Sequence, residues 1–248
     1  MQRFLPLALV LAATAGCAST SDRAAGEVYD PFEPVNRQVF AFNEAADKAV
    51  IGPVADVYET VTPRLAREGV GNVLANLRSP VIFVNDLLQG NDQRAGDTFY
   101  RFFVNSTIGV LGIWDAAAAF GVEGHEEDFG QTLAVWGVDA GPFLVLPLAG
   151  PSNLRDLSGR GFDAAADPLN WVEFKSDEDL DDHIATSRAV LGVLQARVAV
   201  DDQLDMLRDQ PEPYIALRRT YTQQRAAAIR NGQEEQDPYK DLPDFDEF

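Results

Sequence analysis

Apolar positions recur at helical spacing along most of the chain. The pattern begins at Asp30-Pro31-Phe32-Glu33, where Asp30 can cap a helix, Pro31 suits the first helical position, and Glu33 completes a capping-box-like motif. Gly52-Pro53 is a typical helix stop. Between these boundaries the spacing predicts one amphipathic helix, with an apolar face made of Phe32, Val35, Val39, Phe42, Ala46 and Ala49.

Further helices are predicted where the same spacing returns between proline and glycine boundaries. Thr62-Pro63 and Ser79-Pro80 are each expected to start a helix. The longest helix is expected from Ser176 to about Arg208, with one buried stripe of Leu180, Ile184, Leu191, Leu194, Val198 and Leu207. Together the predicted helices cover residues 62–77, 79–88, 92–107, 113–120, 129–136, 153–166, 176–208 and 214–230.

The stretch from Gly137 to Ser152 has a different character. Three prolines and several glycines surround an apolar run at Phe143–Leu146, and this composition excludes a continuous helix. The stretch is expected to form an extended loop or a hairpin. Because alternating strands and internal repeats are absent elsewhere, the sequence predicts an all-α fold: a single domain over residues 30–232, built of short and medium helices with one apolar Pro/Gly-rich loop or hairpin.

The N-terminus has the layout of a secretory signal peptide. Arg3 precedes an apolar run, and small residues follow before Cys17, the only cysteine of the chain. The run is shorter than the ~20 residues that span a bilayer. The site resembles the acylation motif of bacterial lipoproteins, although Thr14 stands where that motif usually has leucine. We predict a signal peptide over residues 1–16, lipidation at Cys17 and a flexible tether over 17–29; the alternative is ordinary secretion with a free thiol.

The charge of the chain narrows the choice of partners. The formal net charge is −19, from 20 basic and 39 acidic residues. Nucleic acid is excluded as a partner, because its binding needs phosphates neutralised by Lys and Arg. Membrane contact is expected to be apolar or covalent, because a basic patch for anionic lipid is missing. Residues 233–248 carry seven carboxylates and one lysine, and we predict that they form an acidic disordered tail.

The motifs of common enzymes are missing from the sequence. It contains no GxSxG elbow, P-loop, dinucleotide-binding GxGxxG or HExxH motif, and only two histidines, His125 and His183. The loop from His125 to Asp128 could hold a cation through carboxylates, but it lacks EF-hand spacing and is better explained as a solvated turn. We predict no enzymatic activity, no cofactor and no metal site, while a Ser-His-Asp site assembled from distant segments stays open.

Several segments in a fixed order resemble the MlaA (VacJ) lipoprotein family of Gram-negative bacteria. The likeness covers about residues 30–232. The segments are Asp30-Pro31-Phe32-Glu33-Pro34-Val35-Asn36-Arg37, Phe40-Ala41-Phe42-Asn43, Asn85-Asp86-Leu87-Leu88-Gln89-Gly90, Arg101-Phe102-Phe103-Val104-Asn105-Ser106-Thr107-Ile108-Gly109, Phe129-Gly130-Gln131-Thr132-Leu133 and Gly141-Pro142-Phe143-Leu144-Val145-Leu146-Pro147-Leu148-Ala149-Gly150-Pro151.

The resemblance implies a ring-like helical domain in the inner leaflet of the outer membrane, held by its lipid on the periplasmic face. It also implies removal of misplaced phospholipid from the outer leaflet, through an amphipathic channel, to the soluble periplasmic carrier MlaC. Trimeric porins are further implied partners. The rival functions are a structural lipoprotein that scaffolds porins without moving lipid, and a lipid-cleaving enzyme.

Two groups of candidate site residues follow from this resemblance and the apolar pattern. The first is a candidate membrane-inserted ridge, and the alternative is that these apolar residues pack in the core of the protein. The ridge comprises Pro142, Phe143, Leu144, Val145, Leu146, Pro147 and Leu148. The second is a channel gate, and its phenylalanines could equally be core anchors; it comprises Phe40, Phe42 and Asn43.

Overall fold

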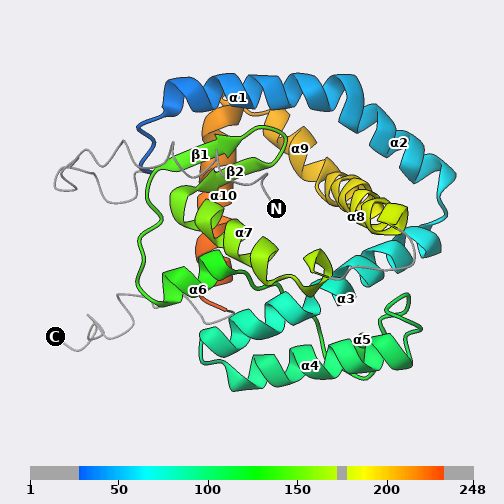
Figure 1. The fold of residues 1–248 in the computed structure, drawn as a ribbon. Helices are drawn as coiled ribbons and strands as arrows, with labels where there is room; N and C mark the ends of the chain where they lie inside the picture. Colours follow the sequence, from blue (N-terminus) through cyan, green and yellow to red (C-terminus); the bar gives the residue numbers. More distant parts are fainter. Residues whose placement is uncertain (1–27, 172–177, 232–248) are drawn as a thin grey trace, which may run out of the picture.

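The computed structural model describes residues 28–171 and 178–231. The signal peptide, Cys17, nearly all of the tether, the helix start at 176–177 and the acidic tail lie outside the described residues. Within the described part the chain is mainly helical with one two-stranded sheet, which confirms the all-α class. The elements form a ring (Figure 1).

The helices and strands follow one another with short connections. In chain order they are α1 (Glu33–Ala46), the π-helical turn η1 (Asp47–Ile51), α2 (Gly52–Val61), α3 (Arg64–Leu88), α4 (Asp92–Thr107), α5 (Ala116–Ala119), α6 (Phe129–Val135), β1 (Phe143–Leu146), β2 (Gly150–Asn153), α7 (Leu154–Ala166), the 3-10 turn η2 (Pro168–Asn170), α8 (Glu178–Ala199), α9 (Asp201–Arg208) and α10 (Pro213–Ile229).

Each side of the ring is built by a different part of the chain. Helices α1 and α2 form one long arc, and the antiparallel pair α3 and α4 lies opposite it (Figure 1). The β1–β2 hairpin, α6 and α7 close one side, and α8 with α9 closes the other. Helix α10 crosses behind the hairpin and contacts α6, α9 and β2.

Two predicted helix boundaries are wrong. At Gly52-Pro53 the helix continues, because η1 inserts a wider turn in which the amide of Gly52 bonds the carbonyl of Asp47. A π turn accommodates the proline, which lacks an N–H, without ending the helix. At Ser79-Pro80 the helix also continues, with Pro80 inside α3. Contacts with α4 along both halves of α3 hold the two parts together across this proline.

The predicted helix over 176–208 is also incorrect in two respects. It is divided at Val200 into α8 and α9, and α3 is longer than either. The expected buried stripe is not formed on α8, where Ile184 is exposed and Leu191, Leu194 and Val198 are only half-buried. The reason is that α8 packs mainly against α2 and α3, so its apolar side chains are only partly covered.

The hairpin is antiparallel and short. Phe143 pairs with Asn153 and Leu146 with Gly150, so that residues 147–149 make the turn. Phe143 and Val145 point into a small core with Tyr214 of α10, between α1 and the hairpin. The ring of Tyr214 meets Phe40 and Phe143 edge-on, at centroid distances of 6.0 and 6.3 Å. The prediction of an extended loop or hairpin between Gly137 and Ser152 is therefore confirmed.

Polar residues dominate the interior of the ring wall. Among the described residues, ten apolar side chains are buried but sixteen polar or charged ones are, so hydrogen bonds hold much of this wall together. Between α3 and α4, Asn76 donates to Ser106 at 2.9 Å and Thr98 donates to Asp86 at 2.7 Å. On the outside of α4, Phe103 is 60% exposed. The α3–α4 pair thus places polar groups inside and apolar groups outside.

Candidate functional site: a cavity inside the ring

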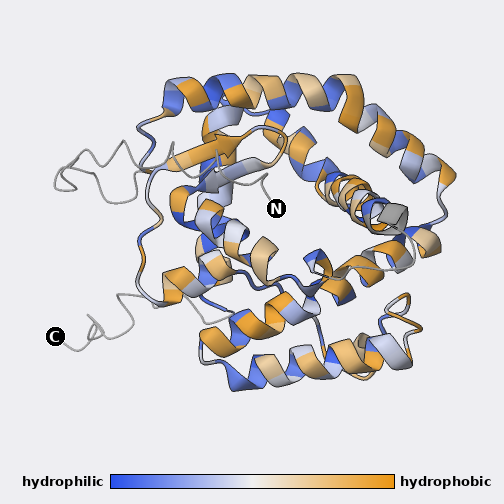
Figure 2. Cartoon of the chain, viewed as in Figure 1, coloured by the Kyte–Doolittle hydropathy of each residue, from blue (hydrophilic) through white to orange (hydrophobic). Residues whose placement is uncertain are grey.

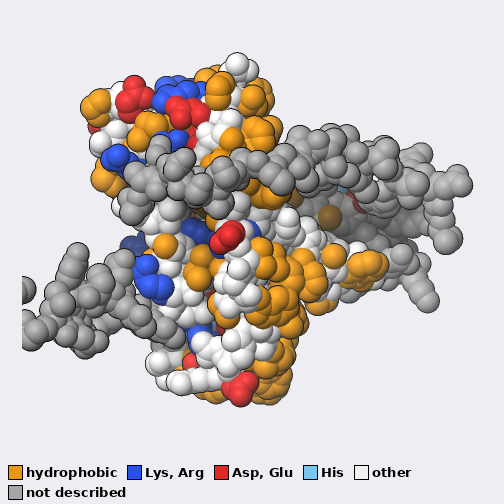
Figure 3. Space-filling model, turned by 90° about the vertical axis from the view of Figure 1, so that its left-hand side faces the viewer, with side chains coloured by type: hydrophobic (Ala, Val, Ile, Leu, Met, Phe, Trp, Pro, Cys, Tyr) orange, Lys and Arg blue, Asp and Glu red, His pale blue; other side chains and the backbone are white. Residues whose placement is uncertain are grey.

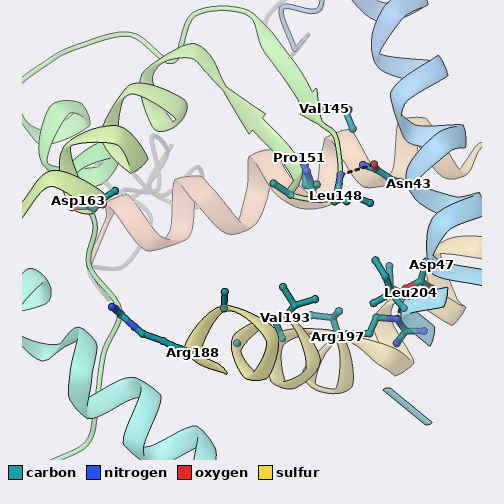
Figure 4. A pocket seen from close by; sticks show the side chains of 18 of the residues that line it. Asn43, Asp47, Val145, Leu148, Pro151, Asp163, Arg188, Val193, Arg197 and Leu204 are labelled. Carbon is teal, nitrogen blue, oxygen red and sulfur yellow. Dashed lines mark hydrogen bonds and ion pairs between the residues drawn. The ribbon is translucent and has the colours of Figure 1, made fainter. Parts of the chain in front are cut away.

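A cavity of about 910 Å³ opens inside the ring. Its walls come from α1, α3, the β1–β2 hairpin, α7, α8 and α9 (Figure 4). Apolar or small residues line the middle of the cavity: Phe40, Val145, Leu148, Pro151, Ala185, Ala189, Gly192, Val193, Ala196 and Leu204. Charged residues line its two ends: Asp47, Arg197, Arg78, Asp163, Asp167 and Arg188.

Helix α8 supplies a smooth wall. Ala185, Ala189, Gly192 and Ala196 recur at helical spacing and all face the cavity. Their small side chains leave the space open, and a Cβ on Gly192 would meet no heavy atom within 4 Å. Opposite them lie Leu148 and Pro151 of the hairpin (Figure 4). The middle of the cavity is therefore bounded by apolar walls on two facing sides.

Two asparagines of α1 fasten the hairpin that forms the facing wall. Asn36 donates from Nδ2 to the carbonyl of Phe143 at 3.0 Å and accepts at Oδ1 from the amide of Val145 at 2.9 Å. Asn43, two turns further on, donates to the carbonyl of Leu146 at 2.9 Å and accepts from the amide of Leu148 at 2.8 Å. Each side-chain amide thus pairs with β1 as a neighbouring strand would.

The structure separates the three candidate gate residues. Phe40 and Asn43 line the cavity, and Asn43 reaches the hairpin turn (Figure 4). Phe42 is 55% exposed and does not line the cavity. Only Phe40 and Asn43 therefore occupy positions from which they could affect passage.

The candidate ridge residues also divide into groups. Phe143 and Val145 are buried in the core with Tyr214, whereas Pro142, Leu144 and Leu146 are half-buried. Pro147 and Leu148 at the turn are exposed, and Leu148 lines the cavity. The apolar run thus contributes to packing through Phe143 and Val145, and to the cavity through Val145 and the turn.

At one end of the cavity, Asp47 is tightly held by two arginines. Arg197 of α8 donates to its Oδ1 at 2.7 Å, and Arg208 of α9 donates to its Oδ2 at 2.6 Å. Burial acts to raise the pKa of Asp47, but these hydrogen bonds outweigh it and hold the pKa below its usual range. The carboxylate lies at η1, so this cluster joins the π turn of the arc to the break between α8 and α9.

At the other end, two carboxylates lie four residues apart, Asp163 in the last turn of α7 and Asp167 directly after this helix. Asp167 is 7% exposed and binds Arg188 of α8 through a 2.5 Å ion pair. Asp163 accepts hydrogen bonds from Asn85 at 2.9 Å and from the amide of Phe129 at 3.1 Å. Burial raises the pKa of Asp163 despite these donors.

The charged lining residues were missed by the sequence analysis. Two sequence signals indicate them in retrospect. Asp163 and Asp167 have an i, i+4 spacing, and Arg188 and Arg197 lie at helical spacing on the same face of α8 as its alanine and glycine residues. Neither signal shows that the two helices meet across a cavity.

The outer surface of the ring is unusually apolar. Figure 2 shows hydrophobic residues along α1, α2, α3 and α4, and Figure 3 shows hydrophobic side chains gathered along one edge of the visible face. The exposed large side chains include Phe32, Val35, Phe42, Val50, Val54, Val57, Val61, Leu65, Leu87, Phe99, Phe102, Phe103 and Trp114. Apolar surface of this extent is typical of a protein that contacts a membrane or a partner.

Membrane-spanning helices and metal-binding clusters are both absent from the described residues. None of their helices combines the length and apolarity needed to cross a membrane. In the same residues, no cluster of three or more His, Cys, Asp or Glu side chains could hold a metal ion.

The fold and the cavity define a class: ring-shaped, mainly helical proteins with an amphipathic cavity and an apolar exterior. The family model described as MlaA lipoprotein matches residues 28–228. The chain belongs to this family.

Relatives and a solved structure agree with this assignment. The Escherichia coli K12 protein named intermembrane phospholipid transport system lipoprotein MlaA is 33% identical over 238 residues, which cover 94% of this chain and 90% of that protein. The Haemophilus influenzae protein of the same name is 30% identical and covers 89% and 87%. A structure described as the structural basis for maintenance of bacterial outer membrane lipid asymmetry superposes with a TM-score of 0.71 and 31% identity, covering 81% of this chain and 98% of that one.

Proposed function

We propose that this protein removes misplaced phospholipid from the outer leaflet of the outer membrane and passes it through the ring to a soluble periplasmic carrier. The observation that carries the proposal is the cavity itself: apolar walls between two charged ends match a molecule with apolar tails and a charged head group. The named function of the relatives, intermembrane phospholipid transport, supports the same reading.

The distribution of polarity supports a position within one membrane leaflet. Exposed apolar side chains on α1, α2 and α4 face outward, while the wall interior is hydrogen-bonded. Backbone and side-chain polar groups need such internal partners where water is excluded. In this proposal the ring lies in the inner leaflet, on the periplasmic face, and acyl chains on Cys17 hold it there.

Transport of this kind needs partners rather than catalysis. We propose that a carrier of the MlaC type receives the lipid and that a trimeric porin holds the ring in place. The protein itself is proposed to act without enzymatic chemistry. Incubating the purified protein with labelled phospholipid would show cleavage products if it were a lipid-cleaving enzyme; we expect none.

A blocked cavity tests the transport role. In the bacterium that encodes this protein, deletion of its gene is expected to increase phospholipid on the cell surface, and the wild-type gene to reverse this. Ala189 lines the cavity on α8, so Ala189→Trp should obstruct it and fail to reverse the defect. The matched control is Ala45→Trp, at an exposed position of α1 outside the cavity.

The outcomes distinguish transport from scaffolding. If folded Ala189→Trp protein restores surface lipid as well as the wild type does, passage through the cavity is wrong. If deletion changes porin assembly and leaves surface phospholipid unaltered, the porin-scaffold function is correct instead. Mass spectrometry of the native protein tests the anchor, for which a bare thiol at Cys17 would be the contrary result.

A further inference from the structure

The two charged ends of the cavity differ in whether their carboxylates have cationic partners. At the first end, two arginines contact both oxygens of Asp47. At the second end, no cationic side chain of the described residues lies within ion-pairing distance of Asp163, although this residue lines the cavity. Its existing partners, the Asn85 amide and the Phe129 backbone amide, are neutral donors.

Asp163 has unused capacity to accept hydrogen bonds. An ionised carboxylate offers about four acceptor sites. The donors of Asn85 and Phe129 occupy at most three, since the Phe129 amide is shared between both oxygens. Burial raises the pKa of this carboxyl group despite these donors and the more distant positive charge of Arg78, which also lines the cavity. A cation entering the cavity would supply the missing charge.

Arg188 provides the opposite charge at the same end. Its Nη2 holds Asp167 at 2.5 Å, which leaves other guanidinium donors of the five free to bind a second anion. Figure 4 shows Arg188 extending from α8 toward the end of the cavity where Asp163 lies. Asp167 directly follows the end of α7, four residues after Asp163, so the ion pair places Arg188 next to this end of the helix.

We propose that Asp163 and Arg188 form a binding site for zwitterionic phospholipid head groups, in which Arg188 binds the phosphate and Asp163 binds a primary ammonium. The apolar wall of Ala185, Ala189 and Val193 continues from this site and accommodates the acyl chains. This inference rests on the proposed transport function and names the lipid class that the cavity prefers. Phosphoethanolamine lipids satisfy both charges, whereas phosphoglycerol lipids satisfy only Arg188.

The charge distribution explains the expected selectivity. A phosphate alone competes with Asp167 for Arg188 and gains nothing from Asp163. An ammonium near Asp163 adds a charge-assisted hydrogen bond, and the N–H donors of a primary amine are needed to form it. Because the site is partly open to solvent, we expect a preference of about threefold, as for partly exposed ion pairs.

A competition experiment tests the site. The full-length lipidated protein is placed in vesicles of equimolar phosphatidylethanolamine and phosphatidylglycerol, and lipid transferred to a soluble acceptor is counted by mass spectrometry. The wild type should transfer about three phosphatidylethanolamine molecules for each phosphatidylglycerol. Asp163→Asn keeps the acceptor oxygen for Phe129 and removes the charge, so the ratio should fall to about one while phosphatidylglycerol transfer is unchanged.

Two variants and one lipid series complete the design. Arg188→Gln should lower transfer of both lipids without changing their ratio, because both carry phosphate. Asp56→Asn removes an exposed charge from α2, outside the cavity, and should match the wild type. On the wild-type protein, methylation of the ethanolamine nitrogen should reduce the preference stepwise, a result that does not depend on the folding of any variant.

The outcomes separate this inference from the transport proposal. Equal transfer of both lipids by the wild type, or a ratio unaffected by Asp163→Asn in folded protein, overturns the head-group site while transport stands. Absence of any transfer overturns the transport proposal. In that case the head-group site is tested on the lipids that the purified protein retains. Enrichment of phosphatidylethanolamine that disappears in Asp163→Asn supports the site, and no enrichment overturns it.

Discussion

Asn36 and Asn43 lie two helical turns apart on α1 and make the same pair of hydrogen bonds to the β1–β2 hairpin. Asn36 bonds Phe143 and Val145 at the buried start of the strand, and Asn43 bonds Leu146 and Leu148 at its exposed end. Removing the side-chain amide therefore has different consequences at the two positions. Water can replace the lost hydrogen bonds at Asn43, which lies at the exposed end, but not at Asn36.

Replacing Asn36 with alanine is expected to destabilise the fold strongly. The substitution leaves the carbonyl of Phe143 and the amide of Val145 without partners in a buried region. Each unsatisfied buried group costs about 1–3 kcal/mol, so for these two groups we expect a loss of about 2–6 kcal/mol. Chemical denaturation of the detergent-solubilised protein measures this, and a change below about 1 kcal/mol would contradict the assigned role.

Asn43→Ala should change transport more than stability. Its backbone partners lie at the edge of the cavity, where solvent can satisfy them, so we expect a destabilisation of only about 0.5–1.5 kcal/mol. The hairpin turn loses its attachment to α1, and surface phospholipid should then differ from the wild-type level. The matched control is Gln38→Ala, because Gln38 is an exposed polar residue of α1 that does not line the cavity. Unaltered surface lipid in folded Asn43→Ala cells would exclude a gate at this position.

The apolar run of the hairpin gives a third prediction, which compares a packed residue with an exposed one. Phe143 is 2% exposed and contacts Tyr214, so Phe143→Ala should cost about 3–5 kcal/mol through the lost burial and the cavity left behind. Leu148→Asp, at the exposed turn, should leave the unfolding free energy within about 0.5 kcal/mol. Equal destabilisation by both changes would assign the whole run to the core.

The sequence predicted the helical period correctly but not which face is buried. The apolar face predicted between residues 32 and 49 contains Phe32, Val35 and Phe42, and these side chains are exposed, while the polar residues Asn36 and Asp47 are buried. Amphipathic spacing identifies two faces and assumes that water lies on the polar one. In this ring the polar side faces the wall interior and cavity, so that assumption fails.

Local boundary signals were overridden by long-range contacts. Pro53 and Pro80 each remove one helical hydrogen bond, a local cost that tertiary contacts can offset. The arc is held at η1 by Arg197 and Arg208, which follow Asp47 by more than a hundred residues and are invisible to local patterns. The hairpin, α4 and the Asp128 cap of α6 were predictable because their signals are local.

Acid sensitivity gives a fourth prediction, centred on Arg225 of α10. Burial acts to raise the pKa of Asp156, but hydrogen bonds from Tyr221 and Arg225 hold it below the usual value. The pKa of Asp128 is lowered against burial by the same arginine. A carboxyl group with a lowered pKa contributes stability above its unfolded pKa of about 3.9, and this contribution is lost as the pH falls through the folded value.

Removing the arginine should therefore shift acid unfolding to higher pH. In Arg225→Ala, burial of Asp128 and Asp156 is no longer offset, so their pKa values rise and the stabilising effect at neutral pH is lost. We expect the unfolding midpoint in an acid titration followed by circular dichroism to rise by about one pH unit. Arg219→Ala, an exposed arginine on the same helix, provides the control. Coinciding titration curves for the two variants would refute this account.

The apolar exterior gives the last prediction, because it should bind lipid without contributing to the fold. Phe103 is 60% exposed on α4, so Phe103→Glu should leave the unfolding free energy within about 0.5 kcal/mol. Burial of one phenylalanine in lipid contributes about 1.5–3 kcal/mol, and the variant should therefore bind neutral vesicles roughly tenfold more weakly. Both proteins are compared in a Cys17→Ser background, so that acyl chains do not mask the difference. Gln93→Glu adds the same charge at an exposed polar position of α4 and should bind as the parent does. If Phe103→Glu loses stability but keeps its vesicle affinity, Phe103 belongs to the packing of the ring and the outward surface of α4 does not face lipid.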